Sequence, residues 1–302
     1  MIDPALLAFG HRYCRQLKIF SWLARCGLAR PGSAAICRLG RWLSPYKAYR
    51  AKIQGAMESA LPLANSDAIW LAWLDNHTRF VTDFLAYPTM DAHWVKENVS
   101  FESADVFSQL CAGGGLFLTF HTHHQNTLAC LPGLAGASVS AVAAAPTESP
   151  LYPVIGHWAE QLNRSSACHF NGGEYLFTND LRGLAKKLRH AFTAGQVVVC
   201  LADVNQGDSD GATVELLGRR IAPPTGVIEM ALRLNVPVFA GILSPRGQGL
   251  ILKTVRIETQ ETLNGTLRAY FSLLEQSIIA DPACWQGWEW FSDLPVIAEH
   301  QT

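Results

Sequence analysis

Three histidines follow a short apolar run in the glycine-rich segment GGGLFLTFHTHHQN. The run ends at His121, and His123, His124 and Asn126 come directly after it. A histidine at the end of a buried strand is partly exposed, and its neutral imidazole can take a proton from an acceptor hydroxyl or amine. Asn126 stands five positions further on, one turn into the next element, from where its amide can orient the imidazole. The motif therefore predicts His121 as a general base and Asn126 as its partner.

Metal binding is a second interpretation of these residues. His121 and His123 would face the same way if the strand continued, and Asp203 would complete the ligand set of a metal-dependent hydrolase. HTHHQN loosely resembles the H-x-H-x-D-H zinc motif, but Gln125 and Asn126 replace its acid and its last histidine. Uncharged amides are poor substitutes for those ligands. Metal binding is therefore kept only as an alternative, and no cofactor is expected.

Apolar runs and helical patterns alternate through most of the chain, which has 302 residues. Apolar runs at 116–121, 137–143, 196–202, 236–243 and 249–257 indicate strands, and helical patterns cover 123–133, 150–163, 180–194, 224–234 and 264–279. Alternation of this kind is typical of an α/β fold with a mostly parallel central sheet and helices on both faces. Further helical patterns at 47–60, 66–86 and 102–112 precede the sheet, and Ser66-Asp67 is expected to cap the second of them. We expect one α/β domain over 46–302, preceded by a helical N-terminal region.

The first 45 residues are expected to form a basic amphipathic arm of two helices that are separated at Pro31-Gly32. Ten Lys or Arg residues and a single acid lie between Met1 and Lys52, whereas the rest of the chain holds 14 Lys or Arg against 24 Asp or Glu. Such a basic stretch suits an acidic partner or an anionic membrane surface. A helix pair packed on the core with a solvated basic face fits equally well. The overall charge of −1 argues against nucleic acid as a partner.

The eight cysteines are scattered singly and form no C-x-x-C pair, which is typical of reduced thiols in a cytoplasmic protein. The start of the chain lacks the continuous apolar region of a signal peptide. An uncharged apolar stretch of about 18 residues, long enough for a transmembrane helix, is also missing. A cytoplasmic location is expected, with peripheral contact to the inner face of the membrane as an option.

Three segments in order resemble the lysophospholipid and lipid A biosynthesis acyltransferases. GGGLFLTFHTHHQN is similar to their block of a glycine, an apolar strand and H-x4-D/E. The segment 200–242 is similar to a later block that holds a strand ending in an acid, a Gly-Arg pair and a Thr-Gly helix start. DPACWQGWEWF (281–291) is similar to their tryptophan-containing tail. The likeness spans about 45–291, and the positions that fall into the pattern of the second block include Asp203, Gln206, Gly218, Arg219 and Thr225.

This resemblance implies transfer of an acyl group from a thioester donor, either acyl-carrier protein or acyl-coenzyme A, to an acceptor hydroxyl or amine. His121 would be the general base and Asn126 its orienting residue. Substrate-binding roles would go to His124, Asp203, Gln206, Gly218, Arg219 and Thr225. Lipid metabolism is the implied context, and the apolar residues around the strand ends would hold the acyl chain.

Two departures from the family pattern change these expectations. Asn126 replaces the carboxylate, so another acid such as Asp203 or Glu174 would have to supply the charge through space, or an amine acceptor would have to react without it. If neither holds, the chain would be a non-catalytic module that binds a lipid or carrier protein. The basic residues after the last tryptophan are replaced by Phe291-Ser292-Asp293. A smaller acceptor than lipid A is therefore expected.

Overall fold

A computed structural model describes residues 3–28, 33–206, 212–247, 249–258 and 262–296. The α-helices are α1 (Pro4–Arg25), α2 (Ala34–Leu43), α3 (Arg50–Ala60), α4 (Ser66–Ala86), α5 (Ala92–Asn98), α6 (Ala104–Gly113), α7 (Gln125–Leu134), α8 (Tyr152–Ala167), α9 (Leu181–Thr193), α10 (Gly226–Arg233), α11 (Leu263–Ala280) and α12 (Trp288–Phe291). Short 3-10 helices are η1 (Pro45–Tyr49), η2 (Tyr87–Thr89), η3 (Pro146–Glu148) and η4 (Pro282–Cys284). The strands are β1 (Val99–Phe101), β2 (Gly115–Thr119), β3 (Val139–Ala143), β4 (Tyr175–Phe177), β5 (Val197–Leu201), β6 (Val214–Leu216), β7 (Arg219–Ile221), β8 (Val238–Arg246) and β9 (Gly249–Ile257).

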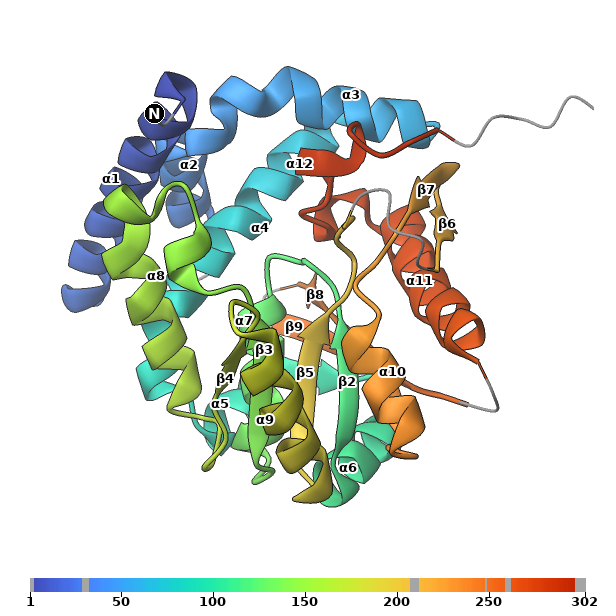
Figure 1. The fold of residues 1–302 in the computed structure, drawn as a ribbon. Coiled ribbons are helices and arrows are strands. Elements are labelled where there is room, and N and C mark those ends of the chain that lie inside the picture. Colours follow the sequence, from blue (N-terminus) through green and yellow to red (C-terminus); the bar gives the residue numbers. More distant parts are fainter. Residues whose placement is uncertain (1–2, 29–32, 207–211, 248, 259–261, 297–302) are drawn as a thin grey trace, which may run out of the picture.

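A seven-stranded sheet in the order β1-β9-β8-β2-β5-β3-β4 organises the molecule (Figure 1). Five adjacent strands, from β8 to β4, are parallel, while β9 is antiparallel to β8 and β1 runs with β9. A separate hairpin consists of β6 and β7. The expected α/β fold with a mostly parallel sheet is confirmed, and helices precede its first strand.

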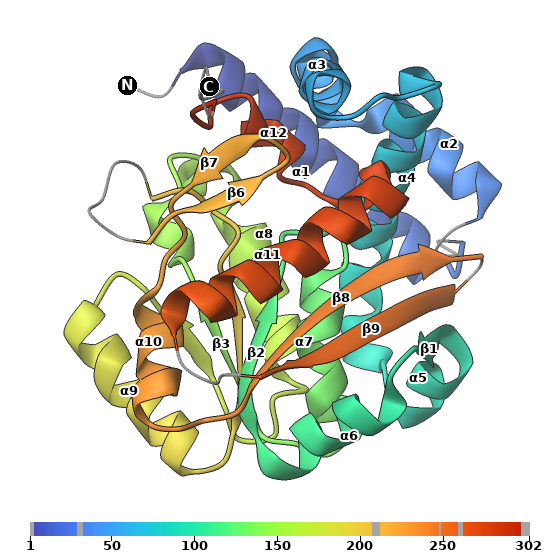
Figure 2. The ribbon, with the colours of Figure 1, turned by 90° about the vertical axis from the view of Figure 1, so that its right-hand side faces the viewer.

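Helices cover both faces of the sheet (Figure 2), and an apolar layer lies beneath them on each face. One layer combines Val198 of β5 with residues of α9, α10 and α11, such as Leu184 and Ile228. The other combines Val199 with residues of α6 and α7, such as Leu128. Neighbouring residues of β5 thus face opposite layers, as the two-residue period of a strand requires. This double burial explains why the central strands read as continuous apolar runs.

Glycines lead the chain into β2 because larger side chains would collide with the neighbouring backbone. Gly114 and Gly115 have φ angles of +68° and +144°. A Cβ atom on Gly114 would lie 2.2 Å from the carbonyl oxygen of Gly195, and one on Gly115 would lie 2.7 Å from that of Pro237. The glycines permit both the turn and the close approach. They therefore allow β2, the strand that ends before His121, to lie between its two neighbours in the sheet.

The two N-terminal helices pack on the body of the protein. Leu17 and Phe20 of α1 and Ile36 of α2 share one buried cluster with Phe80 and Phe84 of α4, and Figure 1 shows α1 beside α8. Basic side chains on α1 are exposed, among them Arg15, Lys18 and Arg25. The expected break at Pro31-Gly32 lies outside the described residues. The described residues 3–28 and 33–45 thus provide a packed helix pair with a basic outer face on α1.

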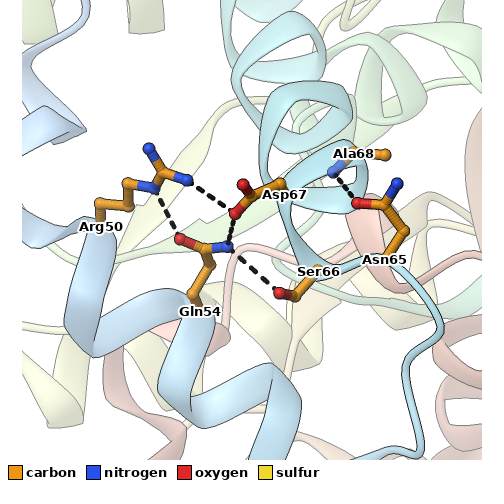
Figure 3. Close-up of polar contacts among 6 residues, drawn as sticks. All are labelled: Arg50, Gln54, Asn65, Ser66, Asp67 and Ala68. Atoms are coloured by element: carbon orange, nitrogen blue, oxygen red, sulfur yellow. Dashed lines mark hydrogen bonds and ion pairs between the residues drawn. The ribbon is translucent and has the colours of Figure 1, made fainter.

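Asn65, rather than Ser66-Asp67, caps α4 (Figure 3). Its side-chain oxygen accepts a hydrogen bond of 3.0 Å from the backbone N–H of Ala68. Asp67 instead binds α3, accepting from Arg50 at 2.7 Å and from Gln54 at 2.8 Å. The residue just before the first helical position is the one whose side chain can reach the free N–H groups of the first turn. Ser66 is already the first residue of α4, so the predicted cap was one residue too far along the chain.

Four strands were not predicted, and each is short. β1, β4, β6 and β7 have three residues apiece, too few to show a period in the sequence.

In the described part of the chain, every helix is too short or too polar to cross a lipid bilayer.

Candidate active site

His121 and Asp203 follow neighbouring strands at one edge of the sheet. β2 pairs with β5 in parallel register, with Thr119 opposite Leu201, so both chains leave the sheet at the same place. The hydroxyl of Tyr270 on α11 ties the two ends together, because it donates to the Thr119 carbonyl and accepts from the Ala202 N–H at 3.1 Å. Ligand sites of open α/β sheets lie outside such carboxyl ends.

A carboxylate orients the imidazole of His121. Asp203 Oδ1 lies 2.7 Å from His121 Nδ1, and Asp203 Oδ2 accepts from the backbone N–H of His121 at 2.9 Å. In the neutral ring this hydrogen bond places the proton on Nδ1 and leaves Nε2 as an acceptor. The side chain of His121 is 26% exposed, whereas that of Asp203 is fully buried. The pair has the arrangement of a general base and the acid that holds it.

Asp203 also receives a hydrogen bond from the C-terminal segment. The indole Nε1 of buried Trp285 donates to Asp203 Oδ2 at 2.9 Å, and the backbone N–H of Gln286 donates to the His121 carbonyl at 2.8 Å. Trp290 lies edge to face against the imidazole, with ring centroids 5.5 Å apart. Of the three tail tryptophans, Trp285 and Trp288 are fully buried, as expected for a core seam, while Trp290 contacts the candidate base.

The structure places the predicted orienting residue elsewhere. We expected Asn126 to bind the imidazole, but Asp203 occupies Nδ1, and Asn126 lines the cavity next to His121 together with Gln125. Glu174, the other acid considered, is exposed and pairs with Lys187 at 2.9 Å. Asp203, the other of the two acids expected to supply the missing charge, reaches the imidazole because β2 and β5 are neighbouring strands.

Two acids raise the pKa of the His121 imidazole. Burial lowers the pKa of His121, but the charge and hydrogen bond of Asp203, together with the charge of Glu289, leave that pKa above its ordinary value of 6.5. Burial raises the pKa of Glu289 to about 7, although a hydrogen bond with Tyr46 and the charges of His121 and Lys52 oppose that shift. Two titratable groups whose pKa values are both raised thus influence one another at this edge.

An apolar cavity of about 580 Å³ opens beside His121. Its size falls within the roughly 300–1,000 Å³ of small-molecule sites. β3, β5, α9 and α10 contribute most of its walls, and the lining includes Val142, Leu184, Val199, Val227 and Met230. Polar side chains also contribute to the lining, among them His121, Gln125, Asn126 and Gln206.

His124 lies apart from this cavity. Its side chain is 2% exposed, and its Nδ1 is 3.3 Å from Asp83 Oδ2 of α4. Gln206, in contrast, lines the cavity, and its backbone N–H donates to the Ala222 carbonyl at 2.9 Å. Among the predicted substrate-binding residues, the structure therefore brings Asp203 and Gln206 to His121 and sends His124 into the helical layer.

Arg219 is held by the C-terminal segment. Its guanidinium donates to the Leu294 carbonyl at 2.7 Å and lies 5.0 Å from the ring centroid of Phe291. Gly218 forms the β6–β7 turn with a φ angle of +74°. Thr225 is the residue before α10 and donates to Glu229 Oε1 at 2.7 Å. These three positions have structural partners that explain them without a ligand.

The proposed metal ligands diverge. His123 is buried against Trp73 and lies 3.0 Å from Gln286 through its Nδ1, while His121 turns to Asp203. Burial lowers the pKa of His123 well below 6.5. Across the described residues, no group of three or more His, Cys, Asp or Glu side chains converges in a way that could hold a metal ion. The ligand set His121, His123 and Asp203 does not assemble.

Trp285, Tyr270 and Glu289 are site residues that the sequence did not indicate. Each reaches the site from a segment distant in sequence from His121, and none belongs to a recognisable local motif. The resemblance placed Trp285 in a family tail but assigned it no role at the site.

No family model matches the chain, and no curated protein is significantly similar to it.

Proposed function

We propose that this protein is an acyltransferase that moves an acyl group from a thioester donor to an acceptor hydroxyl or amine. The observation that carries the proposal is the His121–Asp203 pair beside an apolar cavity of about 580 Å³. A hydrocarbon chain is the natural occupant, since each buried methylene contributes about 0.8 kcal/mol. The thioester carbonyl of a chain bound there would lie beside the imidazole.

His121 acts as base and then as acid in this reaction. Nε2 removes the proton of the acceptor, whose oxygen or nitrogen attacks the thioester carbonyl carbon. The tetrahedral intermediate then expels the thiolate, which takes the proton from the imidazolium. Asp203 keeps its charge throughout, holding the tautomer and stabilising the imidazolium. The acyl group passes directly from donor to acceptor.

Helix α7 supports the charge that develops on the carbonyl oxygen. It begins at Gln125, four residues after His121, and its first-turn residues Gln125 and Asn126 line the cavity. The N-terminal end of a helix carries partial positive charge, which favours an oxyanion placed there. Asn126 then serves as a polar group at the reacting centre rather than as the partner of the base.

The donor is acyl-carrier protein or acyl-coenzyme A in this proposal. Exposed Arg15, Lys18 and Arg25 on α1 form a basic surface that suits an acidic carrier protein or an anionic membrane. Two large apolar side chains, Trp22 at 58% and Trp42 at 69% exposure, lie on the same helix pair. They fit peripheral contact with the inner face of a membrane in the cytoplasm.

Release of free thiol from a panel of acyl-carrier and acyl-coenzyme A donors tests the proposal. Wild type, His121→Ala and His190→Ala are compared, since His190 is an exposed histidine on α9. We expect His121→Ala to lower kcat by at least 100-fold and His190→Ala to leave it unchanged. Full turnover by His121→Ala would refute the assignment. Donor binding without thiol release by wild type would indicate a binding module, and stoichiometric zinc in the purified protein would favour a hydrolase.

A further inference from the structure

A second, smaller cavity lies between α1, η1, α3 and the C-terminal helix α12. Its volume is about 170 Å³, roughly five to six times the ~30 Å³ share of one water molecule in the liquid. It therefore suits a small polar head group rather than an acyl chain. Its lining consists of Leu6, Phe9, Tyr46, Tyr49, Lys52, Ile53 and Glu289.

Aromatic rings and one carboxylate define the chemistry of this cavity. The ring of Phe9 lies edge to face against Tyr46 and Tyr49, with centroids 5.1 and 5.6 Å apart. Tyr46, which also lines the cavity, opposes the rise that burial causes in the pKa of the Glu289 carboxyl. Lys52 is engaged by Asp293 at 2.9 Å, which offsets its charge. Aromatic faces next to a carboxylate attract organic cations.

The carboxylate also adjoins the candidate base. Glu289 precedes Trp290, whose indole contacts the His121 ring, and Gln286 of the same segment binds the His121 backbone. The electrostatic effects of Glu289 and His121 on one another are mutual. A cation held by Glu289 would thus lie one residue from the indole that packs on the imidazole, within the electrostatic reach of His121.

We propose that this cavity binds the ammonium group of the acceptor, so that the enzyme acylates an amine. The inference rests on the proposed acyl transfer and narrows its acceptor class.

The chemistry balances without a further reagent. The ammonium group gives one proton to the Glu289 carboxylate, and the free amine attacks the thioester carbonyl carbon while His121 Nε2 takes its second proton. The C–N bond of an amide forms, the C–S bond breaks, and the thiolate takes the proton from His121. Glu289 releases its proton to water. The net products are an amide, a thiol and one proton.

Titration with n-butylammonium and the isosteric n-butanol tests the site apart from catalysis. The indole NMR signal of Trp290 reports occupancy, and His121→Ala is included to remove the base. We expect the ammonium to bind at least tenfold more tightly than the alcohol, to do so in His121→Ala as well, and to lose at least tenfold in Glu289→Gln. Tyr49→Leu, which removes an aromatic face, should lose severalfold, while the exposed Glu58→Gln should have no effect.

Equal binding of ammonium and alcohol by wild type, or unchanged ammonium binding by both Glu289→Gln and Tyr49→Leu, would overturn the inference. Selective ammonium binding without thiol release from any donor would leave the cation site intact and refute the acyl transfer instead. Thiol release with alcohols but not with amines would keep the transferase and reject the amine acceptor. In an active enzyme, Glu289→Gln should raise the KM for an amine at least tenfold and leave the KM for the donor unchanged.

Discussion

Glu289 makes folding depend on pH in a direction that can be worked out. Burial raises its pKa from 4.5 to about 7, against the opposing effects of Tyr46, His121 and Lys52. The folded protein therefore binds this proton more tightly than the unfolded chain. Its contribution to stability is fully present below pH 4.5 and is lost as the pH rises to about 7. At ~1.4 kcal/mol per pH unit, this interval corresponds to a loss of about 3 kcal/mol at most.

Glu289→Gln removes that dependence while keeping a side chain of similar shape. We expect its advantage in unfolding free energy over wild type to grow by about 2–3 kcal/mol between pH 5 and pH 8. Urea unfolding followed by tryptophan fluorescence at both pH values measures this change, because differences between variants remove the contribution of every other group. Glu58→Gln, at an exposed position on α3, is the matched control and should show no such growth. An advantage that is the same at both pH values would refute the argument that Glu289 ionises at a buried position.

Three further predictions concern the larger cavity and the basic surface. Asp203→Asn should lower kcat by about 10³–10⁴-fold. Because Asp203 helps to raise the pKa of His121 above 6.5, the acid limb of the kcat/KM profile should also move to lower pH in this variant. An acid limb unchanged from wild type would count against the His121–Asp203 pair. Val142→Phe should shift the donor preference to shorter chains, with about a fourfold loss for each methylene that no longer fits, as measured by kcat/KM across a series of chain lengths. Charge reversal on α1 should raise the KM for an acidic carrier protein and weaken its dependence on salt, and an unchanged KM would refute docking through Arg12, Arg15 and Lys18.

Much of the sheet could be predicted because its strands are buried on both faces. The run ending at His121 and the run ending at Ala202 contain mostly apolar residues, and both form central strands. The structure gives β9 the predicted bounds, Gly249–Ile257. The three-residue strands could not be found, because pairing with an existing sheet edge, rather than a local pattern, makes them strands.

The partner of His121 was harder to predict than His121 itself. Sequence proximity favoured Asn126, whereas Asp203 is 82 positions away. The apolar run before Asp203 indicated a strand, but nothing in the sequence indicated that this strand lies next to β2. Asp203 and Glu174 were both expected as possible sources of the charge, and because strand order is set by the packing of whole helices and loops, only the fold distinguishes them.

The two acids beside His121 differ in a way that suits different tasks. Asp203 is fully buried and accepts from the His121 backbone, the imidazole and Trp285, so any rotation would leave a buried donor unsatisfied. A carboxylate fixed in this way is suited to keeping the proton of the neutral His121 ring on Nδ1. Glu289 is half-buried, lines a cavity and has a pKa of about 7, so it can exchange protons and ligands near neutral pH. An anionic acceptor would meet like charge at this position and a cationic one would not, which is the strongest reason to expect an amine rather than a phosphorylated lipid as the acceptor.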